Sequence, residues 1–454
     1  MLFGFLFITY SYIFNEFPGW NGSSRMDLVY AVVEQGKLNI DTFWNKPGYE
    51  TYDVAVYKNL HYCDKSPMLS FLGIPAYWVW RQIVDSLNIY ATPWQGRYPV
   101  VVFAVCLPSA ILGVLLFRML GFIRLNPRDQ LLTVFFYSLG TVSFPYSVLF
   151  LSHQTSGVFI FACFYFLYLL FKKGDVIKPL ILLICGIIGG FGFTIEPLSG
   201  IGILGLSLYV LYKLRKKYQI IWFFIGIGLV MLIPMIYNYL CFQSPFSLGY
   251  KYELLPVFQS GMAKGIMGIT WPKFKAFWGI TFSPFRGLFF ESPFLLLAIP
   301  GFYYLIRRTE FKAEGILALF IFLGFFYCNI SYYVWTGGWA AGPRHIIPSL
   351  PFLVLAVYPM FPKARIWIIL TGILSVIILS IITITEPQVS EEFKYPLFQF
   401  NIPRLVDGSL TNNFLTLFGM ARTYAMLIWG IFVVCGMGFL YWKAKEMSKA
   451  IPET

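Results

Sequence analysis

The tetrapeptide SRMD at residues 24–27 is the first candidate for acid–base chemistry in this chain. A carboxylate at a membrane face can take the proton from an acceptor hydroxyl, and Arg25 beside Asp27 favours the ionised form of that carboxylate. The same spacing also fits a capping box, with Ser24 as the N-cap of a short helix that ends at Gly36. Asp27 is therefore either a general base or a carboxylate that only starts a helix.

A lysine directly before a predicted helix is the second candidate group. Lys65 follows Tyr62 and Asp64 and precedes Ser66-Pro67, a pair typical of the first turn of a helix. A phosphate beside that turn would meet the ammonium group and the helix amino terminus together. The alternative is a lysine that reaches lipid headgroups. Asp64 is a candidate ligand for a divalent cation, although no second acidic or histidine ligand lies at a telling spacing.

Four more ionisable groups lie where long apolar runs end. They are His153, Glu196 and the pair Arg344-His345, which belongs to the segment WTGGWAAGPRHIIP at residues 335–348. Ionisable groups at membrane depth are costly and mark functional sites, although a hydrogen bond to a neighbouring helix would also satisfy them. Because a guanidinium binds phosphate through two parallel hydrogen bonds, Arg344 is a second candidate phosphate ligand. The alternative for Arg344 is a contact with lipid headgroups.

The composition places these groups in a membrane protein. Hydrophobic residues make up 58% of the chain and charged residues only 12%, about half the charged fraction of soluble proteins. Apolar runs of about 17 to 22 residues recur, which is the length that a helix needs to cross a bilayer. The connections are too short to hold a soluble domain. The sequence predicts an all-α, polytopic integral membrane protein that forms one domain over residues 1–454.

Twelve apolar runs are predicted to span the membrane. They are the first helix, near the amino terminus, followed by 98–117, 131–150, 154–171, 178–195, 198–212, 219–240, 287–306, 315–334, 346–361, 366–385 and 422–441. Lys and Arg residues gather in alternate short connections, which the positive-inside rule places in the cytoplasm. The net charge of +13 therefore reflects topology, and nucleic acid is not expected as a partner.

The opposite connections are predicted to face outward, and they hold the candidate groups. The longest are a first outer loop at 15–97 and two further loops at 238–286 and 386–421. Residues 67–87 are long enough to cross the membrane, but Arg81 and Asp85 favour an amphipathic helix that lies in the interface. If this segment did cross, the first loop alone would become cytoplasmic. The expected location is the plasma (inner) membrane, with the site facing the periplasm or the cell exterior.

The order of these motifs resembles the GT-C glycosyltransferases. In that superfamily a large first outer loop carries an early aspartate and then a Tyr-x-Asp-Lys-Ser-Pro sequence, here 62–67, that leads into an interfacial helix. The segments PYSVLFLSHQ, NYLCFQSPFSLGY, FRGLFFESPFLLL and GGWAAGPRHIIPSLPFLVL are similar to a bacterial branch of the superfamily. The nearest relatives implied are protein mannosyltransferases that use dolichyl-phosphate mannose, and the bacterial aminoarabinose transferase of lipid A.

The resemblance implies a polyprenyl-phosphate donor that carries one sugar and is used from the outer leaflet. Asp27 falls where the family places its catalytic carboxylate, and Asp64-Lys65 falls where the family has an acidic residue followed by a phosphate-binding lysine. His153 occupies the region of a second acidic residue in relatives, which puts a two-carboxylate arrangement in doubt. The Trp-Trp-Asp-Tyr-Gly motif of oligosaccharyltransferases is absent from the sequence, so transfer of a large glycan to asparagine is not expected.

Together these features predict an inverting glycosyltransferase that moves a single hexose or pentose to an acceptor hydroxyl. Asp27 would be the base, and Lys65 and Arg344 would stabilise the departing lipid phosphate. The acceptor is a lipid, a polysaccharide or a protein, membrane lipids surround the enzyme, and a divalent metal ion is the one cofactor left open. The alternative is a transporter or flippase of a lipid-linked sugar, which would place its polar groups near mid-membrane.

Overall fold

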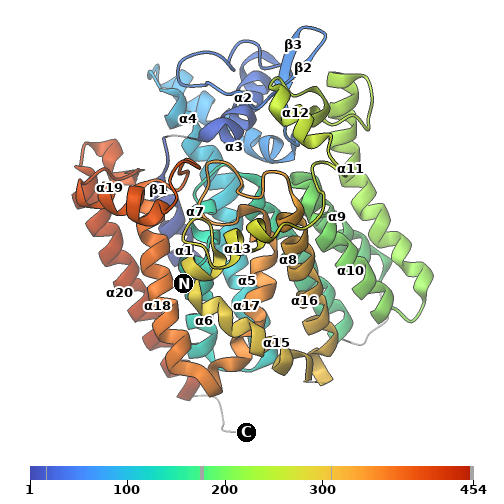
Figure 1. Cartoon of the computed structure of the whole chain (residues 1–454), viewed down its shortest axis with the longest axis vertical. Coiled ribbons are helices and arrows are strands. Elements are labelled where there is room, and N and C mark those ends of the chain that lie inside the picture. Colours follow the sequence, from blue (N-terminus) through green and yellow to red (C-terminus); the bar gives the residue numbers. More distant parts are fainter. Residues whose placement is uncertain (17, 174–177, 308, 450–454) are drawn as a thin grey trace.

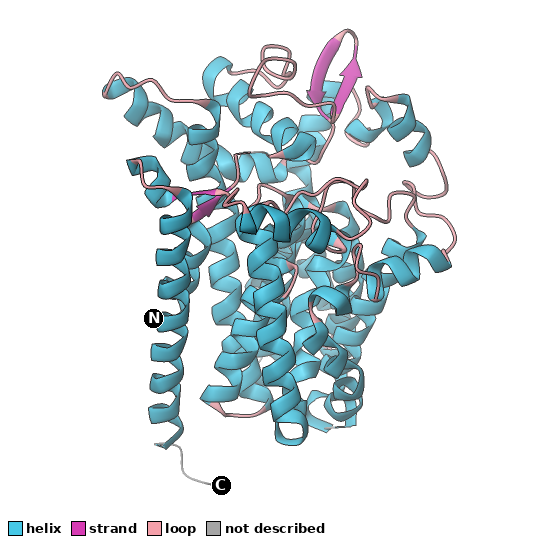
Figure 2. Ribbon diagram, turned by 60° about the vertical axis from the view of Figure 1, so that its left-hand side comes forward, coloured by secondary structure: helices cyan, strands magenta, loops and turns pink. Residues whose placement is uncertain are grey.

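The protein is described here by a computed structural model that covers residues 1–16, 18–173, 178–307 and 309–449. Long helices form a bundle, and a layer of loops and short helices covers one end of it (Figures 1 and 2). The strands form two small antiparallel pairs. β1 (Ile13–Phe14) pairs with β4 (Asn412–Asn413), and β2 (Val54–Tyr57) pairs with β3 (Leu60–Cys63). The all-α class predicted from the sequence is confirmed.

The bundle contains the apolar helices of a multi-pass membrane protein. Six described segments are long and apolar enough to cross a membrane: Pro93–Ile123, Ser152–Lys172, Lys217–Phe242, Lys312–Ser331, Arg344–Thr385 and Arg422–Lys449. Four shorter apolar helices accompany them: Leu2–Ser11, Pro179–Ile195, Pro197–Lys213 and Pro293–Arg307. Segment Arg344–Thr385 bends at Ala364, between two predicted spans. The number of twelve spans stays a prediction.

One predicted span is shorter than expected. The run 131–150 holds only the end of α6 (Pro127–Gly140) and the short helix α7 (Ser143–Tyr146). The α6 helix ends at Gly140 and cannot run on through residue 145. Pro145 has no N–H to donate to the Thr141 carbonyl, and its ring would clash with that carbonyl. The chain then reaches α8 (Ser152–Lys172) through an irregular buried segment.

The covering layer is built mainly from residues 15–97, the segment predicted as the first outer loop. It contains α2 (Gly19–Gln35), α3 (Met68–Ser86) and the start of α4 (Pro93–Val101). The α3 segment is not among the described segments apolar enough to span, and it lies in the covering layer (Figure 1), as predicted for an interfacial helix.

The α2 helix differs from the prediction at its start. It begins at Gly19 after Pro18, five residues before the N-cap predicted at Ser24, although it ends as expected at a left-handed Gly36. Because Gly22, Ser23 and Ser24 are all buried, tertiary packing rather than the local capping preference decides where this helix starts.

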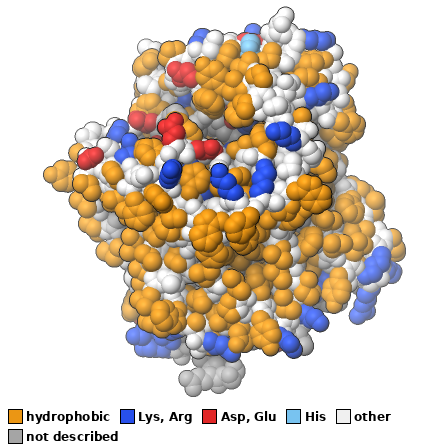
Figure 3. Space-filling model, viewed as in Figure 1, with side chains coloured by type: hydrophobic (Ala, Val, Ile, Leu, Met, Phe, Trp, Pro, Cys, Tyr) orange, Lys and Arg blue, Asp and Glu red, His pale blue; other side chains and the backbone are white. Residues whose placement is uncertain are grey.

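Two later loops complete the covering layer. The first follows α11 (Ile220–Phe242) and contains η4 (Gly249–Tyr252), α12 (Pro256–Met262) and α13 (Phe274–Thr281); it packs on β2, where the Leu254 N–H donates to the Val54 carbonyl at 2.8 Å. The second lies between α18 (Phe361–Thr385) and α20 (Arg422–Lys449) and faces the β2–β3 hairpin across a hollow. In Figure 3, hydrophobic side chains cover the bundle, while acidic and basic side chains gather around the hollow and basic ones line the opposite edge.

Candidate active site

The β2–β3 hairpin brings an aspartate and a lysine together. Val54 pairs with Cys63 at its open end, so Asp53, which precedes β2, lies opposite the residues that follow β3. The hairpin closes through Lys58 and Asn59, both with positive φ, as a two-residue type I′ turn requires. The Lys65 ammonium lies 3.2 Å from the Asp53 carboxylate.

Lys65 is held as a largely buried cation, with 11% of its side chain exposed. It is bonded to the carboxylate of Asp64, which is itself fully buried, and its Nζ lies 5.3 Å from the centre of the Tyr250 ring. Burial alone would lower the pKa of Lys65, but the charges of Asp53 and Asp64 raise it well above its ordinary value. Lys65 therefore stays charged in the pH range of cells and is ready for an anion.

A cavity of about 590 Å³ opens beside this pair, and a second hollow of about 300 Å³ adjoins it. The two hollows have seven lining residues in common: Asn21, Lys65, Tyr250, Met262, Tyr332, Arg344 and His345. They are therefore two lobes of one cavity. Lys65 and Arg344, the two predicted phosphate ligands, both lie where the lobes meet, and the Arg344 Nε has no hydrogen-bond partner among the described residues.

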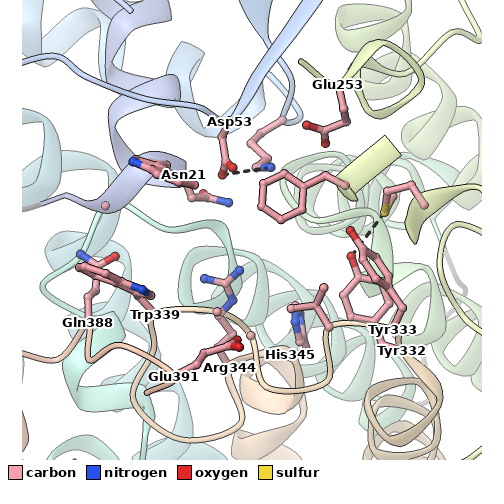
Figure 4. A pocket seen from close by; sticks show the side chains of 18 of the residues that line it. Asn21, Asp53, Glu253, Tyr332, Tyr333, Trp339, Arg344, His345, Gln388 and Glu391 are labelled. Carbon is pink, nitrogen blue, oxygen red and sulfur yellow. Dashed lines mark hydrogen bonds and ion pairs between the residues drawn. The ribbon is translucent and has the colours of Figure 1, made fainter. Parts of the chain in front are cut away.

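The larger hollow, here called the acidic lobe, is lined by carboxylates and aromatic rings. Its distinguishing residues are Asp53, Glu253, Glu391 and Glu392, with Trp20, Trp339, Phe258 and Tyr333. Figure 4 shows Asp53 and Glu253 on one side of the lobe and Trp339, Gln388 and Glu391 on the other. Burial and the charge of Asp64 raise the pKa of Glu253 to about 9, so this carboxyl is protonated at neutral pH.

The smaller hollow, here called the basic lobe, combines cations with an apolar wall. Arg25, Ser152, His153 and Glu196 line it together with Leu198, Ile201, Ile266, Met267, Ile269 and Cys328. The apolar side chains come from η2 (Pro197–Ser199), α10 (Gly200–Lys213), α16 (Lys312–Ser331) and the loop after α12, next to the bundle. The basic lobe therefore offers charge at its junction with the acidic lobe and hydrocarbon contact beyond it.

Several predicted residues meet in the basic lobe. The His153 ring contacts the His345 ring edge to face at 5.2 Å, and His345 contacts Tyr332 at 5.1 Å. The Glu196 carboxylate accepts a hydrogen bond from Ser152 at 2.6 Å and lies 3.3 Å from His153 Nδ1. These groups come from three separate helix ends, which explains why the sequence did not reveal their contact.

Arg25 ties the walls of the basic lobe to one another. Its guanidinium donates hydrogen bonds to the Asn21 side chain at 3.0 Å, to the Ser66 carbonyl at 2.9 Å and to the Ser152 hydroxyl at 3.2 Å. These bonds connect α2 to the segment just after Lys65 and to the start of α8. They leave Arg25 pointing away from Asp27, which it was predicted to keep ionised.

Asp27 does not line either lobe, and the predicted meeting of Asp27 with Lys65 is not what the structure shows. Asp27 is fully buried, and neither carboxylate oxygen has a hydrogen-bond partner among the described residues. Burial raises its pKa well above the ordinary value of 3.8, and Arg97 opposes only part of that shift. On a helix, two residues lie about 200° apart at a separation of two positions, so Arg25 and Asp27 face opposite ways.

Two further predicted residues lie outside the cavity lining. Tyr62 packs its ring 5.5 Å from Phe242, and Asp64 is enclosed behind Lys65, with the Ser24 hydroxyl at 3.4 Å. Among the residues that the structure describes, no group of three or more His, Cys, Asp or Glu side chains could hold a metal ion. The Asp64 carboxylate is already occupied by the Lys65 ammonium.

Asp53 is the residue that sequence reasoning missed. The signal was present, because VAVY and LHYC flank Lys58-Asn59 and a tight hairpin there places residue 53 opposite residue 64. Glu253, Glu391 and Glu392 carried no such signal. They reach the cavity through contacts between loops that are far apart in the sequence.

Comparison with known proteins finds solved structures of similar fold, but no match by sequence to a family model or a curated protein. Among solved structures, ArnT from Cupriavidus metallidurans in the apo state is similar, with a TM-score of 0.50 and 15% identity over 96% of this chain and 75% of that one. The same enzyme bound to undecaprenyl phosphate gives 0.46, at 15% identity over 97% and 76% of the two chains.

A third similar structure is the Archaeoglobus fulgidus oligosaccharyltransferase AglB, in complex with an inhibitory peptide and a dolichol-phosphate. Its TM-score is 0.46 and its identity 13%, over 88% of this chain and 52% of that one. Identities of this size show only that a fold is shared. The chain therefore has the fold of the apo ArnT structure, and the resemblance predicted from the sequence is confirmed at that level.

Proposed function

We propose that this protein is an inverting glycosyltransferase that moves one sugar from a polyprenyl-phosphate donor to an acceptor hydroxyl at the outer face of the plasma membrane. One observation carries the proposal. Two cations from distant loops, Lys65 and Arg344, line the junction between a lobe with an apolar wall and a lobe rich in carboxylates and aromatic rings. Such a junction suits a phosphate that carries a lipid on one side and a sugar on the other.

The basic lobe is the proposed place for the phosphate and the first part of the prenyl chain. Leu198, Ile201 and Ile269 would contact the chain, and burying each methylene group contributes about 0.8 kcal/mol. Lys65 and Arg344 would bind the phosphate oxygens, and charge-assisted hydrogen bonds of this kind are roughly twice as strong as neutral ones. Phosphate bound there would direct the anomeric carbon into the acidic lobe.

Asp53 replaces Asp27 as the proposed base, because it lines the acidic lobe and lies beside Lys65. The bond between the anomeric carbon and the phosphate oxygen breaks, and its electron pair leaves with the phosphate. The acceptor oxygen forms the new bond to that carbon from the opposite side, and its proton passes to the Asp53 carboxylate. Lys65 and Arg344 stabilise the charge that develops on the phosphate. A single displacement inverts the anomeric configuration.

The test is transfer of sugar by the purified protein in lipid nanodiscs. Polyprenyl phosphates that each carry one labelled sugar would be offered together with an extract of bacterial envelope lipids, polysaccharides and proteins. The expected result is label in a new glycosidic product of inverted anomeric configuration, formed by the protein and not by its Asp53→Asn variant. In a parallel assay with the protein reconstituted in vesicles, movement of the intact labelled donor across the membrane, without any new product, would instead establish a flippase.

The fold likeness to ArnT supports transfer over transport. Polar lining residues gather between the bundle and its covering layer (Figure 4), whereas a transporter needs its site near mid-membrane between two halves that move.

A further inference from the structure

The segment from Phe285 to Pro293, FRGLFFESP, holds two buried charges that the proposed reaction does not use. Arg286 is 1% exposed and Glu291 is 5% exposed, and neither lines the acidic or the basic lobe. Burying a charge costs free energy unless hydrogen bonds or an opposite charge compensate it. The partners of these two side chains therefore indicate what they are for.

Arg286 contacts two loops from different parts of the chain. Its Nη2 donates a hydrogen bond to the Val389 carbonyl at 2.8 Å and a longer one to the Gly338 carbonyl at 3.3 Å. Gly338 belongs to the glycine loop (336–343), and Val389 belongs to the acidic loop (386–392). A guanidinium has several donors in a fixed plane, so one arginine can hold two backbone carbonyls at a set distance.

Glu291 holds the far end of the glycine loop. Its Oε1 accepts a hydrogen bond from the Gly342 backbone N–H at 3.2 Å. Gly342 has a positive φ of +49°, and a Cβ atom there would lie 2.3 Å from Val142 and 2.7 Å from Glu291. Only glycine fits this approach. The glycine loop is thus held at two points. Arg286 binds it at Gly338, and Glu291 binds it at Gly342, two residues before Arg344.

The two loops also contact each other. The Ala340 N–H donates to the Val389 carbonyl at 3.3 Å, and the Thr336 hydroxyl donates to the Glu391 carboxylate. Val389 thus receives hydrogen bonds from both Arg286 and Ala340. Arg286 thus adds a third contact, from behind, to the two direct hydrogen bonds between the loops.

These loops supply the wall of the acidic lobe that faces Asp53. Trp339 comes from the glycine loop, and Gln388, Ser390, Glu391 and Glu392 come from the acidic loop. Figure 4 shows Trp339, Gln388 and Glu391 together on this wall, across the cavity from Asp53. The position of the wall therefore sets the width of the acidic lobe.

We propose that Arg286 and Glu291 form a buried clamp that joins the glycine loop to the acidic loop and so positions the acceptor-binding wall of the cavity. The acceptor role rests on the proposed glycosyl transfer, whereas the clamp itself does not. Arg286 and Glu291 are positioning residues, because they touch the wall and not the cavity. The clamp acts mainly on acceptor binding. It reaches the donor phosphate only through Arg344, two residues beyond Gly342, and it does not touch Lys65.

The clamp is tested with Arg286→Met and Arg286→Lys, with Lys394→Met as the control. Lys394 is exposed on the same outer loop region, so its removal takes away a positive charge without touching the clamp. Amide hydrogen exchange is measured over the whole chain, together with polyprenyl-phosphate binding and the KM for acceptor. Arg286→Met should speed exchange in residues 336–343 and 386–392, with no change at 53–65. Arg286→Lys should show a smaller effect, because one ammonium cannot hold both carbonyls in the same geometry.

In transfer assays, Arg286→Met should raise the KM for acceptor about tenfold, the cost of one lost charged hydrogen bond. Polyprenyl-phosphate affinity should fall less than that, because Lys65 keeps its place while only Arg344 follows the glycine loop directly. Unchanged exchange in both loops would overturn the clamp. So would faster exchange everywhere, including 53–65, because Arg286 would then support the whole fold. If the protein transfers no sugar at all, the proposed function fails, and the exchange result still decides whether the clamp exists.

Discussion

Asp27 and Asp53 belong to the same outer loop, yet the structure gives them opposite environments. Asp53 lies at the open end of a hairpin, lines the acidic lobe and has a cation 3.2 Å away. Asp27 lies inside α2, fully buried, and neither of its oxygens has a hydrogen-bond partner among the described residues. A carboxylate needs access to the acceptor as well as a position in the right loop, and only Asp53 has that access.

The comparison shows that a residue reaches the cavity only if it lies on the face of its helix or strand that points there. Its position in the sequence alone does not decide this. Asn21 and Arg25, one helical turn apart on α2, both line the basic lobe. Asp27 is two positions beyond Arg25 and so points to the other side, toward Arg97. The β2–β3 pairing has the opposite effect on Asp53. It brings Asp53 next to Lys65, although Asp53 lies twelve positions earlier in the chain.

The largest effect is expected for Asp53→Asn. Removing a general base lowers turnover by about 10²- to 10⁴-fold, and the isosteric amide leaves the hairpin in place. The measurement is the single-turnover rate at saturating donor, with folding checked by thermal unfolding. Asp53→Glu should recover part of the rate. An Asp53→Asn enzyme with near-normal turnover, beside an inactive Asp27→Asn enzyme, would reverse the two assignments.

The next largest effect is expected for Lys65→Met. Hydrogen bonds to charged groups contribute about 1.5 to 3 kcal/mol, so polyprenyl-phosphate affinity should fall about 10- to 100-fold. Lys65→Arg keeps the positive charge beside Asp64 and should retain more of the binding. Lys58→Met is the matched control, because Lys58 is exposed at the closed end of the same hairpin. Equal binding by the Lys65 and Lys58 variants would show that the phosphate binds elsewhere.

A smaller, opposite effect is expected for Asp27→Asn. Turnover should stay within about threefold of wild type, since no contact with the cavity is lost. Because burial raises the pKa of Asp27 in the folded protein, its carboxyl destabilises the fold increasingly as pH rises above its unfolded value. The variant should therefore unfold like wild type near pH 4 and at a higher temperature than wild type near pH 8. A lower melting temperature at pH 8 would mean that the carboxylate has a stabilising partner.

Patterns within single segments were enough to predict the fold class and much of the cavity. The lengths of the apolar runs predicted the helical bundle. The candidate residues Lys65, Arg344, His153 and Glu196 all line the same two-lobed cavity. Each of these residues stands at the end of an apolar run or beside a helix start, where the sequence marks it as unusual. The level of a residue along the helical bundle can be predicted in this way.

The direction in which a side chain points depends on where its helix or strand begins and ends. Local sequence patterns do not determine those boundaries. The start of α2 was predicted at Ser24, but burial of the preceding turn moved it to Gly19. A capping preference is worth about 1 kcal/mol, and packing of a whole turn exceeds that. The acidic loop and Glu253 reach Asp53 only through loop-to-loop contacts, which no local pattern records.

The smallest effect concerns Glu253, which shares the acidic lobe with Asp53. Its pKa of about 9, raised by burial and by the charge of Asp64, keeps it neutral at pH 7 and lets it ionise as pH rises toward 10. The new negative charge would compete with the donor phosphate for Lys65, and two unit charges about 4 Å apart interact by about 1 kcal/mol in water. Donor affinity should therefore fall by about fivefold or less between pH 8 and pH 10.

Glu253→Gln keeps this side chain neutral at every pH. The variant therefore distinguishes an effect of the Glu253 carboxyl from an effect of the Asp53 carboxyl. The variant should bind donor like wild type at pH 7 and lose less affinity than wild type at pH 10. Its fold should also gain stability relative to wild type as pH rises from about 4.5 to about 9 and gain no more above that, because a carboxyl with a raised pKa in the folded state destabilises between its unfolded and folded pKa values. If wild type and variant lose affinity in parallel, the alkaline change belongs to another group.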